Sequence, residues 1–239
     1  MDLRIFAQST DQSALSLQNF FRPCTDTIMQ AYPGATFATD ARQAEPKPYY
    51  EYWVSLISQQ SAKHKVVLPH KGISVDIPPP ADTEDFLYEQ PSYETANPVE
   101  LLSFGPSVKA PIGHVVHARS GDKGSDANVG FFARNQDEWD WLRSLLTVAK
   151  VKDMLGSDYK GGKIYRFELP SIWGMLYRPL HSVRSSTNTD LAVHFLLKDH
   201  LDRGVSSTSS YDALGKNVAE YLRCRRVLVP QKFLARGRI

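Results

Sequence analysis

The chain has 239 residues, of which 42% are hydrophobic and 23% are charged, and its formal net charge is +2. These values are typical of a globular protein, and the balanced charge gives no overall attraction to nucleic acid or to an anionic membrane. The chain has no apolar run near the ~20 residues that cross a bilayer and no signal-peptide core at its N-terminus. Its two cysteines fit no metal or disulfide pattern. We therefore expect a cytoplasmic protein with neither membrane nor nucleic acid as a partner.

The first third of the sequence predicts a small α+β unit over residues 1–67. Alternating or β-forming residues predict strands at 3–7, 35–39 and 50–58. Between the first two, residues 13–32 have apolar side chains at roughly helical spacing, and Pro23 should kink or divide that helix. The order strand, helix, strand, strand suits a sheet layer covered by a helix.

Residues 68–111 differ in composition from the rest, because they contain eight prolines, three of them consecutive at 78–80. Such a run excludes an ordinary helix and disfavours a central strand. We expect a linker or an extended arm. Its aromatic residues, including Tyr93 and Phe104, indicate that parts of it pack against neighbours.

The second half, residues 112–239, has denser signals and predicts a second α+β layer. Strands are predicted at residues 113–118, 127–134, 163–169 and 205–209. Helices are predicted at residues 137–146, 147–155, 191–201 and 212–223. Thr147 should cap the second of these helices, and Gly156 should end it.

The segment that joins the first two of these strands, residues 119–126, carries the candidate ligand site. Two glycines allow a turn and close approach of the backbone to a ligand, while Arg119 and Lys123 can hold a carboxylate or a phosphate. Asp122 could orient a cation or accept a proton, and a neighbouring histidine titrates near neutral pH. The candidate ligand-binding residues are His117, Arg119, Ser120, Gly121, Asp122, Lys123, Gly124 and Asn128.

Several other chemistries are weaker alternatives. A tight turn whose charges satisfy one another explains the same segment, and neither a Walker loop nor a GxGxxG motif is present. His114 and His117 would point to opposite faces of a strand, so we expect no metal site. Without a GxSxG motif, no nucleophile or other catalytic residue is assigned, and no cofactor is expected. The hydroxyl-rich run 206–210 fits either a pocket wall or a polar strand edge, and the aromatic residues near 131–141 fit core packing better than base stacking.

The segment His117–Arg134, which reads HARSGDKGSDANVGFFAR, resembles the signature of the C-terminal ferredoxin-like domain of the acyclic terpene utilisation AtuA-like family. The resemblance covers roughly residues 110–235. Residues 1–105 are similar to the end of the larger preceding domain in fungal members, through the segments that start at Tyr32, Lys47 and Ser103. Because family members are usually much longer, the resemblance implies that this chain is a fragment or a shortened paralogue. It also implies a link to the catabolism of acyclic terpenoids or related acyl-CoA compounds, without supplying a mechanism.

Residues 173–190 interrupt this resemblance and look inserted. Residues 174–175 can be encoded as an intron donor, and residues 186–190 can be encoded as a branch point followed by an acceptor. We hypothesise a retained intron. Transcript reads that all cross this segment without a gap would exclude it.

Together these patterns predict two small α/β sandwich layers joined by a proline-rich segment, and the resemblance implies that the second layer is ferredoxin-like. Two functions follow as hypotheses. In the first, the second layer binds a small anionic ligand, an acyl-CoA or a carboxylate, at residues 119–128. In the second, it is a non-catalytic assembly domain that docks onto a partner subunit or a second copy of itself through a sheet edge.

Overall fold

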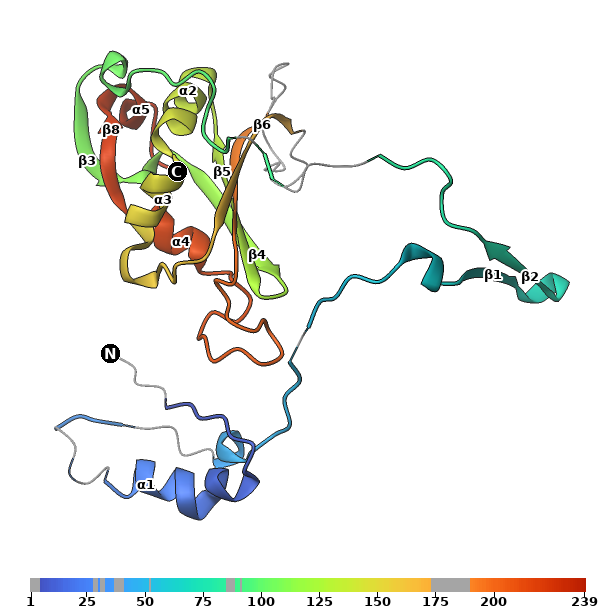
Figure 1. The fold of residues 1–239 in the computed structure, drawn as a ribbon. Coiled ribbons are helices and arrows are strands. Elements are labelled where there is room, and N and C mark those ends of the chain that lie inside the picture. Colours follow the sequence, from blue (N-terminus) through green and yellow to red (C-terminus); the bar gives the residue numbers. More distant parts are fainter. Residues whose placement is uncertain are drawn as a thin grey trace.

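The structure, a computed structural model, describes residues 5–27, 30, 33–36, 41–51, 53–84, 89–90, 92–172 and 190–239 (Figure 1). All but the last residue of the segment expected to be an insertion, 173–190, lies outside these residues. The retained intron therefore stays a hypothesis.

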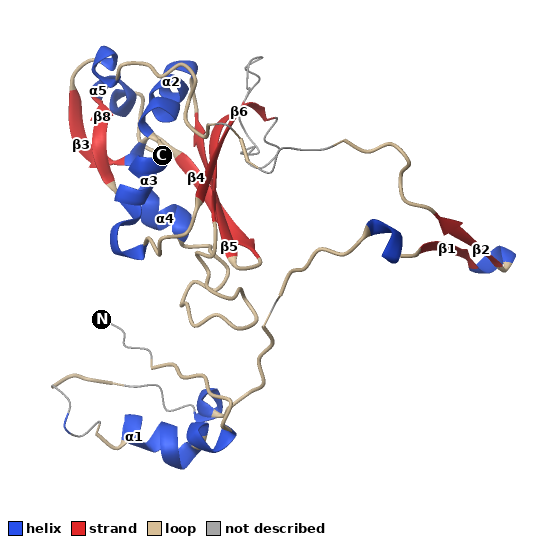
Figure 2. Cartoon of the chain, viewed as in Figure 1, coloured by secondary structure: helices blue, strands red, loops and turns tan. Residues whose placement is uncertain are grey.

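The centre of the C-terminal half is a four-stranded antiparallel sheet in the order β4-β5-β7-β6 (Figure 2). Its strands are β4 (His117–Lys123), β5 (Asp126–Ala133), β6 (Ile164–Ile172) and β7 (Asp190–Leu197). β4 and β5 form a hairpin, and β7 lies between β5 and β6. Consecutive residues of a strand face opposite sides of the sheet, so the register decides which side chains share a face.

Three helices cover one face of this sheet: α2 (Gln136–Leu145), α3 (Val148–Leu155) and α4 (Val218–Arg223). Thr147 caps α3 by accepting a hydrogen bond from the backbone N–H of Lys150, and Gly156 follows its last residue with a φ of 57°. Both features confirm the predicted start and end of that helix. The α+β class is confirmed as well.

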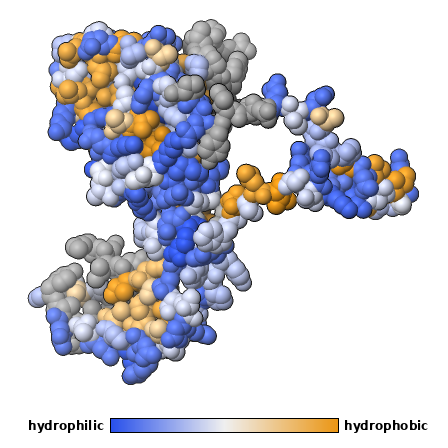
Figure 3. Space-filling view, in the orientation of Figure 1, coloured by the Kyte–Doolittle hydropathy of each residue, from blue (hydrophilic) through white to orange (hydrophobic). Residues whose placement is uncertain are grey.

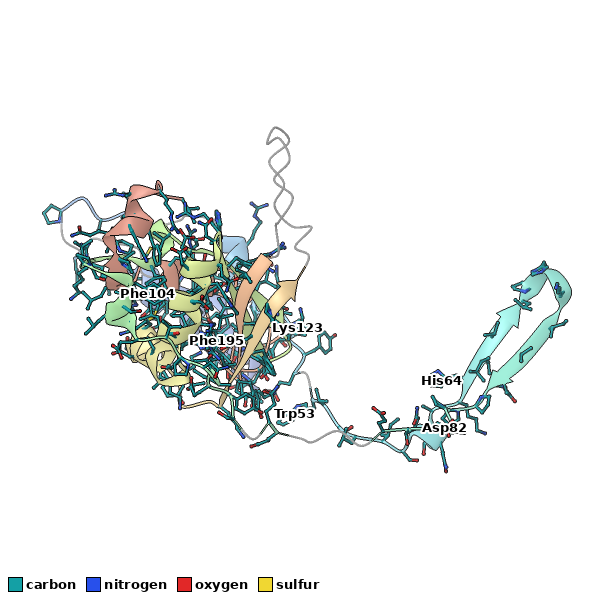
Figure 4. The ribbon with its side chains drawn as sticks, turned by 90° about the horizontal axis from the view of Figure 1, so that it is seen from above. Trp53, His64, Asp82, Phe104, Lys123 and Phe195 are labelled. Atoms are coloured by element: carbon teal, nitrogen blue, oxygen red, sulfur yellow. The ribbon has the colours of Figure 1, made fainter. Side chains whose placement is uncertain are left out.

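A second, smaller sheet pairs β3 (Ser107–Pro111) with β8 (Arg226–Pro230), and α5 (Gln231–Ala235) follows directly. Phe233 of α5 contacts the rings of Phe104 and Trp141, at centroid distances of 5.9 and 5.7 Å. These contacts join the end of the chain to α2. Phe195 of β7 lies inside the body of the domain, and Lys123 lies at its edge (Figure 4).

The described residues before this domain contain little regular structure. Three short helical segments follow one another, namely Gln12–Leu15 (3-10), Leu17–Phe21 (π) and α1 (Arg22–Thr25). Pro23 lies in the first turn of α1, where a missing N–H costs no hydrogen bond. Farther on, β1 (His64–Leu68) and β2 (Ile73–Ile77) form a hairpin that stands away from the sheet (Figure 1). β1 extends one residue past 67, where the sequence predicts the end of the first unit. The division of the chain into three parts stays a prediction.

Several predicted elements are wrong. The helix expected at 191–201 is strand β7, because a short apolar run buried between two strands has the same composition as a buried helix. The strand expected at 113–118 begins only at His117, after a 3-10 turn over Ile112–His114. The last helix is six residues long rather than twelve, since the chain forms turns until Asn217. Among the described residues of the ranges 3–7, 35–39, 50–58 and 205–209, none forms a strand.

Residues 119–126 are not the loop that the sequence predicts. Arg119–Lys123 continue β4, and Lys123 pairs with Asp126, so the turn consists of Gly124 and Ser125 alone. Gly124 has a φ of 65°, a backbone conformation that favours glycine. The charged residues therefore lie on a rigid hairpin.

Candidate functional site

The hairpin β4–β5 divides the candidate residues between two faces of the sheet. Ser120 and Asp122 pair with Val129 and Ala127, which are buried in the core, so both lie on the face that the helices cover. Arg119 lies on the other face, which we call the open face. The open face also carries His117, Gly121, Lys123 and, on β5, Asn128.

The Ser120 hydroxyl forms hydrogen bonds that stabilise the fold. Its hydroxyl accepts a hydrogen bond from the backbone N–H of Ala219 at 2.9 Å and donates to the carbonyl of Lys216 at 3.2 Å. Only 6% of the residue is exposed. Ser120 therefore fixes α4 and its preceding turn against β4, and neither it nor Asp122 joins the residues of the open face.

Two of the predicted residues on the open face have polar groups that no described residue binds. The Arg119 guanidinium and the Asn128 amide form no hydrogen bond or ion pair with the part of the chain that the structure describes. Lys123 donates to the backbone carbonyl of Asp122, at 2.8 Å. The charged-turn alternative, in which these side chains satisfy one another, is therefore not what the hairpin forms.

The fold brings a third cation, Lys216, to this place, which the sequence alone does not indicate. A β-carbon on Gly121 would lie 3.2 Å from Lys216 Nζ and 3.4 Å from Asn128 Oδ1. The turn that carries Lys216 can approach because Gly215, at a φ of 61°, packs directly against the carbonyl of Gly121. Because Gly121 has no side chain, its backbone is accessible between the Lys216 ammonium and the Asn128 amide.

Beside these polar groups, the open face continues as an apolar and aromatic surface. By register it includes Phe132 of β5, Leu196 of β7, and Tyr165 and Phe167 of β6. The ring of Phe132 lies over Gly130, 3.3 Å from the place of a β-carbon there. The face therefore combines a cationic edge with an adjoining apolar strip.

Tyr93 covers one end of this strip. Its ring contacts those of Tyr165 and Phe167, with centroid distances of 5.0 and 6.1 Å. The Tyr93 carbonyl also accepts a hydrogen bond from the guanidinium of Arg166 at 3.2 Å. This contact confirms that part of the proline-rich segment packs against the domain.

Two histidines of the open face are held in the neutral form. Burial lowers the pKa of His194, which lies across Gly130 from Arg119. Burial also lowers the pKa of His117, and the nearby cations Arg223 and Arg134 lower it further. A neutral imidazole offers one hydrogen-bond donor and one acceptor, so neither residue adds to the positive charge of the face.

The structure contains a second concave feature that the sequence does not place. It is a cleft of about 340 Å³ near the end of α3 and the start of α4, and its lining includes His200, Asp158 and Ser210. Ser210 belongs to the hydroxyl-rich run 206–210, so one member of that run lines a pocket. The cleft shares no residue with the open face.

Within the described residues, no three histidine, cysteine, aspartate or glutamate side chains are grouped so that they could hold a metal ion. None of the helices in that part of the chain is both long and apolar enough to cross a membrane.

Comparison with known families decides where the chain belongs. Residues 110–228 match the AtuA ferredoxin-like domain, and residues 1–68 match the acyclic terpene utilisation family protein AtuA. The chain belongs to the AtuA family. This membership links it to acyclic terpene utilisation, and the ferredoxin-like match includes both strands of the hairpin β4–β5. No curated protein and no solved structure matches the chain.

Proposed function

We propose that this AtuA-family protein binds an anionic ligand, an acyl-CoA or a carboxylate from acyclic terpenoid or acyl-CoA catabolism, on the open face of β4 and β5. The observation that carries the proposal is that Gly121 lies beside Lys216 Nζ and on the same face as Arg119, whose guanidinium has no partner among the described residues. Neither the guanidinium nor the Lys216 ammonium forms a hydrogen bond with the described residues, so both can bind an oxyanion.

The remaining groups of the open face suit the rest of such a ligand. The amide of Asn128 can orient a bound oxygen, and Lys123 adds positive charge at the end of the hairpin. The apolar strip through Phe132 and Leu196 can cover a hydrocarbon chain. An amphipathic anion therefore matches the face better than a small inorganic ion.

Thermal unfolding with octanoyl-CoA, octanoate and octanol tests the proposal, because the three share a chain and differ in charge. We expect the two anions to raise the melting temperature and octanol to have little effect. Arg119→Ala and Lys216→Ala should each weaken anion binding roughly tenfold, the effect of about 1.4 kcal/mol.

Lys109→Ala, an exposed lysine of β3, is the matched control and should bind like the unchanged protein. Equal stabilisation by octanol, or full binding by both Arg119→Ala and Lys216→Ala, would contradict the proposal.

A second candidate function, assembly with another copy of the chain, is favoured by an exposed apolar segment. Residues 53–57 are extended, and the exposed fractions of Trp53, Leu56 and Ile57 are 82%, 100% and 71%. The β1–β2 hairpin is exposed as well, although an isolated two-stranded hairpin is only marginally stable in water. Figure 3 shows these hydrophobic residues on the arm that leads away from the domain.

A second copy suits this segment because one chain carries both complementary parts. The start of the segment is tied to the domain by the Glu51–Arg203 ion pair of 3.1 Å, so its apolar residues project outward. β4 and β6 are edge strands of the sheet and can accept an added strand. A two-fold dimer would place each arm on the other copy.

Light scattering after size exclusion tests assembly. We expect a dimer that Trp53→Ser together with Leu56→Ser converts to monomer, while Lys109→Ser stays dimeric. A monomer at high concentration of the unchanged protein would exclude this function and leave the ligand proposal intact.

A further inference from the structure

The cleft of about 340 Å³ lies where four separate segments meet. Its lining consists of Leu155, Ser157, Asp158, Lys160, His200, Leu201, Ser210, Tyr211, Asp212, Asn217, Val218 and Tyr221. The volume lies at the lower end of the range for small-molecule pockets and holds about ten waters. A ligand of roughly ten non-hydrogen atoms would fill it.

Hydrogen bonds between the segments hold the walls in place. Lys160 Nζ donates to the carbonyl of His200 at 2.9 Å, and the Tyr221 hydroxyl donates to the carbonyl of Leu155 at 2.9 Å. Asp212 accepts from the backbone N–H groups of Lys216 and Asn217, both at 2.8 Å. The cleft is therefore preformed, and a ligand would not have to order its walls.

The floor of the cleft is apolar. Leu155 and Leu201 are each 1% exposed, and Val218 is 6% exposed. These side chains are already covered, so the apolar area that a ligand can bury lies at the rim, where Tyr211 is 81% exposed.

The polar groups of the lining favour a cation over an anion. Asp158 and Asp212 supply two carboxylates, and the only ammonium, on Lys160, is already bonded to the His200 carbonyl. Burial and the charge of Lys160 lower the pKa of His200, so its imidazole is neutral at pH 7. The formal charge of the lining is consequently negative, opposite to that of the open face.

Two of these groups have polar atoms that a ligand can bind. Neither the Asp158 carboxylate nor the His200 imidazole forms a side-chain hydrogen bond within the described ranges. A half-buried imidazole loses hydrogen bonds to water unless another group replaces them. A ligand with N–H donors could donate hydrogen bonds both to the His200 imidazole and to the Asp158 carboxylate at the rim of the cleft.

We propose that this cleft is a second ligand site, for a small molecule that joins a protonated primary amine to a short apolar body. The ammonium lies between Asp158 and His200, and the apolar body covers the exposed ring of Tyr211 at the rim. The site is independent of the anion site, since the two share no residue.

Three hexyl compounds provide the test: hexylammonium, hexanoate and hexanol, titrated into the full chain and followed by backbone amide NMR shifts. We expect hexylammonium to shift the amides of residues 155–160 and 200–201 with a dissociation constant on the order of 1 mM. Hexanoate should leave them unchanged, because the carboxylates repel it, and hexanol should bind more weakly than hexylammonium.

Asp158→Asn should weaken hexylammonium binding about tenfold, since it removes the charge but keeps the shape and size of an exposed side chain. Asp153→Asn, an exposed carboxylate of α3 outside the cleft, is the matched control and should bind normally. Arg119→Ala should also leave hexylammonium binding unchanged. No shift with hexylammonium, equal shifts with hexanoate, or full affinity in Asp158→Asn would each overturn the proposal.

Discussion

Lys216 Nζ lies 3.2 Å from the point that a β-carbon on Gly121 would occupy, although the two residues are far apart in the sequence. A methyl group at this point would lie closer to the ammonium than an ordinary van der Waals contact allows. It would also lie 3.4 Å from Asn128 Oδ1. The end of the Lys216 side chain is flexible, so the ammonium would move away from the methyl group and the fold would be kept.

Gly121→Ala should therefore keep the stability within about 1 kcal/mol and weaken octanoate binding several-fold. Urea unfolding and calorimetric titration with octanoate measure the two effects. Unchanged affinity in Gly121→Ala would show that the approach of Lys216 to this backbone is irrelevant to ligand binding.

Arg166 should be the most important single polar residue for the stability of the domain. Its guanidinium, 2% exposed, donates to the carbonyls of Leu146 and Arg143, both at 2.8 Å, and pairs with Glu168 at 2.8 Å. The two carbonyls lie at the C-terminal end of α2, where the helix has no following turn whose N–H groups could donate to them.

Arg166→Met should lower the free energy of unfolding by about 3–5 kcal/mol, because buried acceptors lose their donors. Urea unfolding measures the loss. Arg226→Met, in which an exposed arginine loses one bond to the Lys109 carbonyl, should cost less than about 1 kcal/mol. Similar losses in the two variants would mean that the burial of Arg166 does not matter.

His194 should make stability depend on pH. Burial lowers its pKa below the ordinary 6.5, so the unfolded chain binds a proton at a higher pH than the folded chain does. The stability contributed by the neutral imidazole is present above pH 6.5 and is lost as the pH falls toward the folded pKa.

His194→Gln should reduce the dependence of the free energy of unfolding on pH below 6.5. Urea unfolding from pH 7.5 to pH 5 detects the change, while His70→Gln, on the exposed turn of the β1–β2 hairpin, should keep the original slope. A His194→Gln profile that superimposes on the original would rule out this contribution.

Gly162 should not tolerate a side chain. A β-carbon there would lie 2.1 Å from the carbonyl oxygen of Lys198, which is backbone and cannot rotate away. Gly162→Ala should therefore cost roughly 1–3 kcal/mol and weaken hexylammonium binding, because the segment displaced contains Lys160 and borders His200.

Gly130→Ala is the comparison, since its β-carbon would meet side chains that can shift, the ring of Phe132 at 3.3 Å and His194 Nδ1 at 3.5 Å. Thermal unfolding of both variants measures the difference. A smaller loss in Gly162→Ala than in Gly130→Ala would contradict the assignment.

The elements that the sequence predicts well are those with local signals. Such signals are the amphipathic spacing of α2, and the Thr147 cap and terminal Gly156 of α3. Each acts within a few residues, so the local sequence is enough to predict it. Two strands of the sheet, β5 and β6, follow from runs of apolar and β-forming residues. By contrast, β3 and β8 pair across about half of the chain, and neither is predicted.

The candidate site shows the same division. The sequence indicates its position and the chemistry of Arg119, Lys123 and Asn128, but it treats the segment as a loop and includes Ser120 and Asp122. The strand pairing separates those residues onto opposite faces. The cleft near His200 depends on four segments, so no local pattern could reveal it.

By itself, then, the sequence determined the α+β class, the family, the helices with local caps and the place of a cationic hairpin. Only the tertiary structure decided that β7 is a strand, which side chains of β4 remain available, and that Lys216 joins them. The physical reason is the range of the forces involved. Propensity and capping act along the chain, whereas strand register and the approach of distant turns depend on packing between residues that no spacing rule connects.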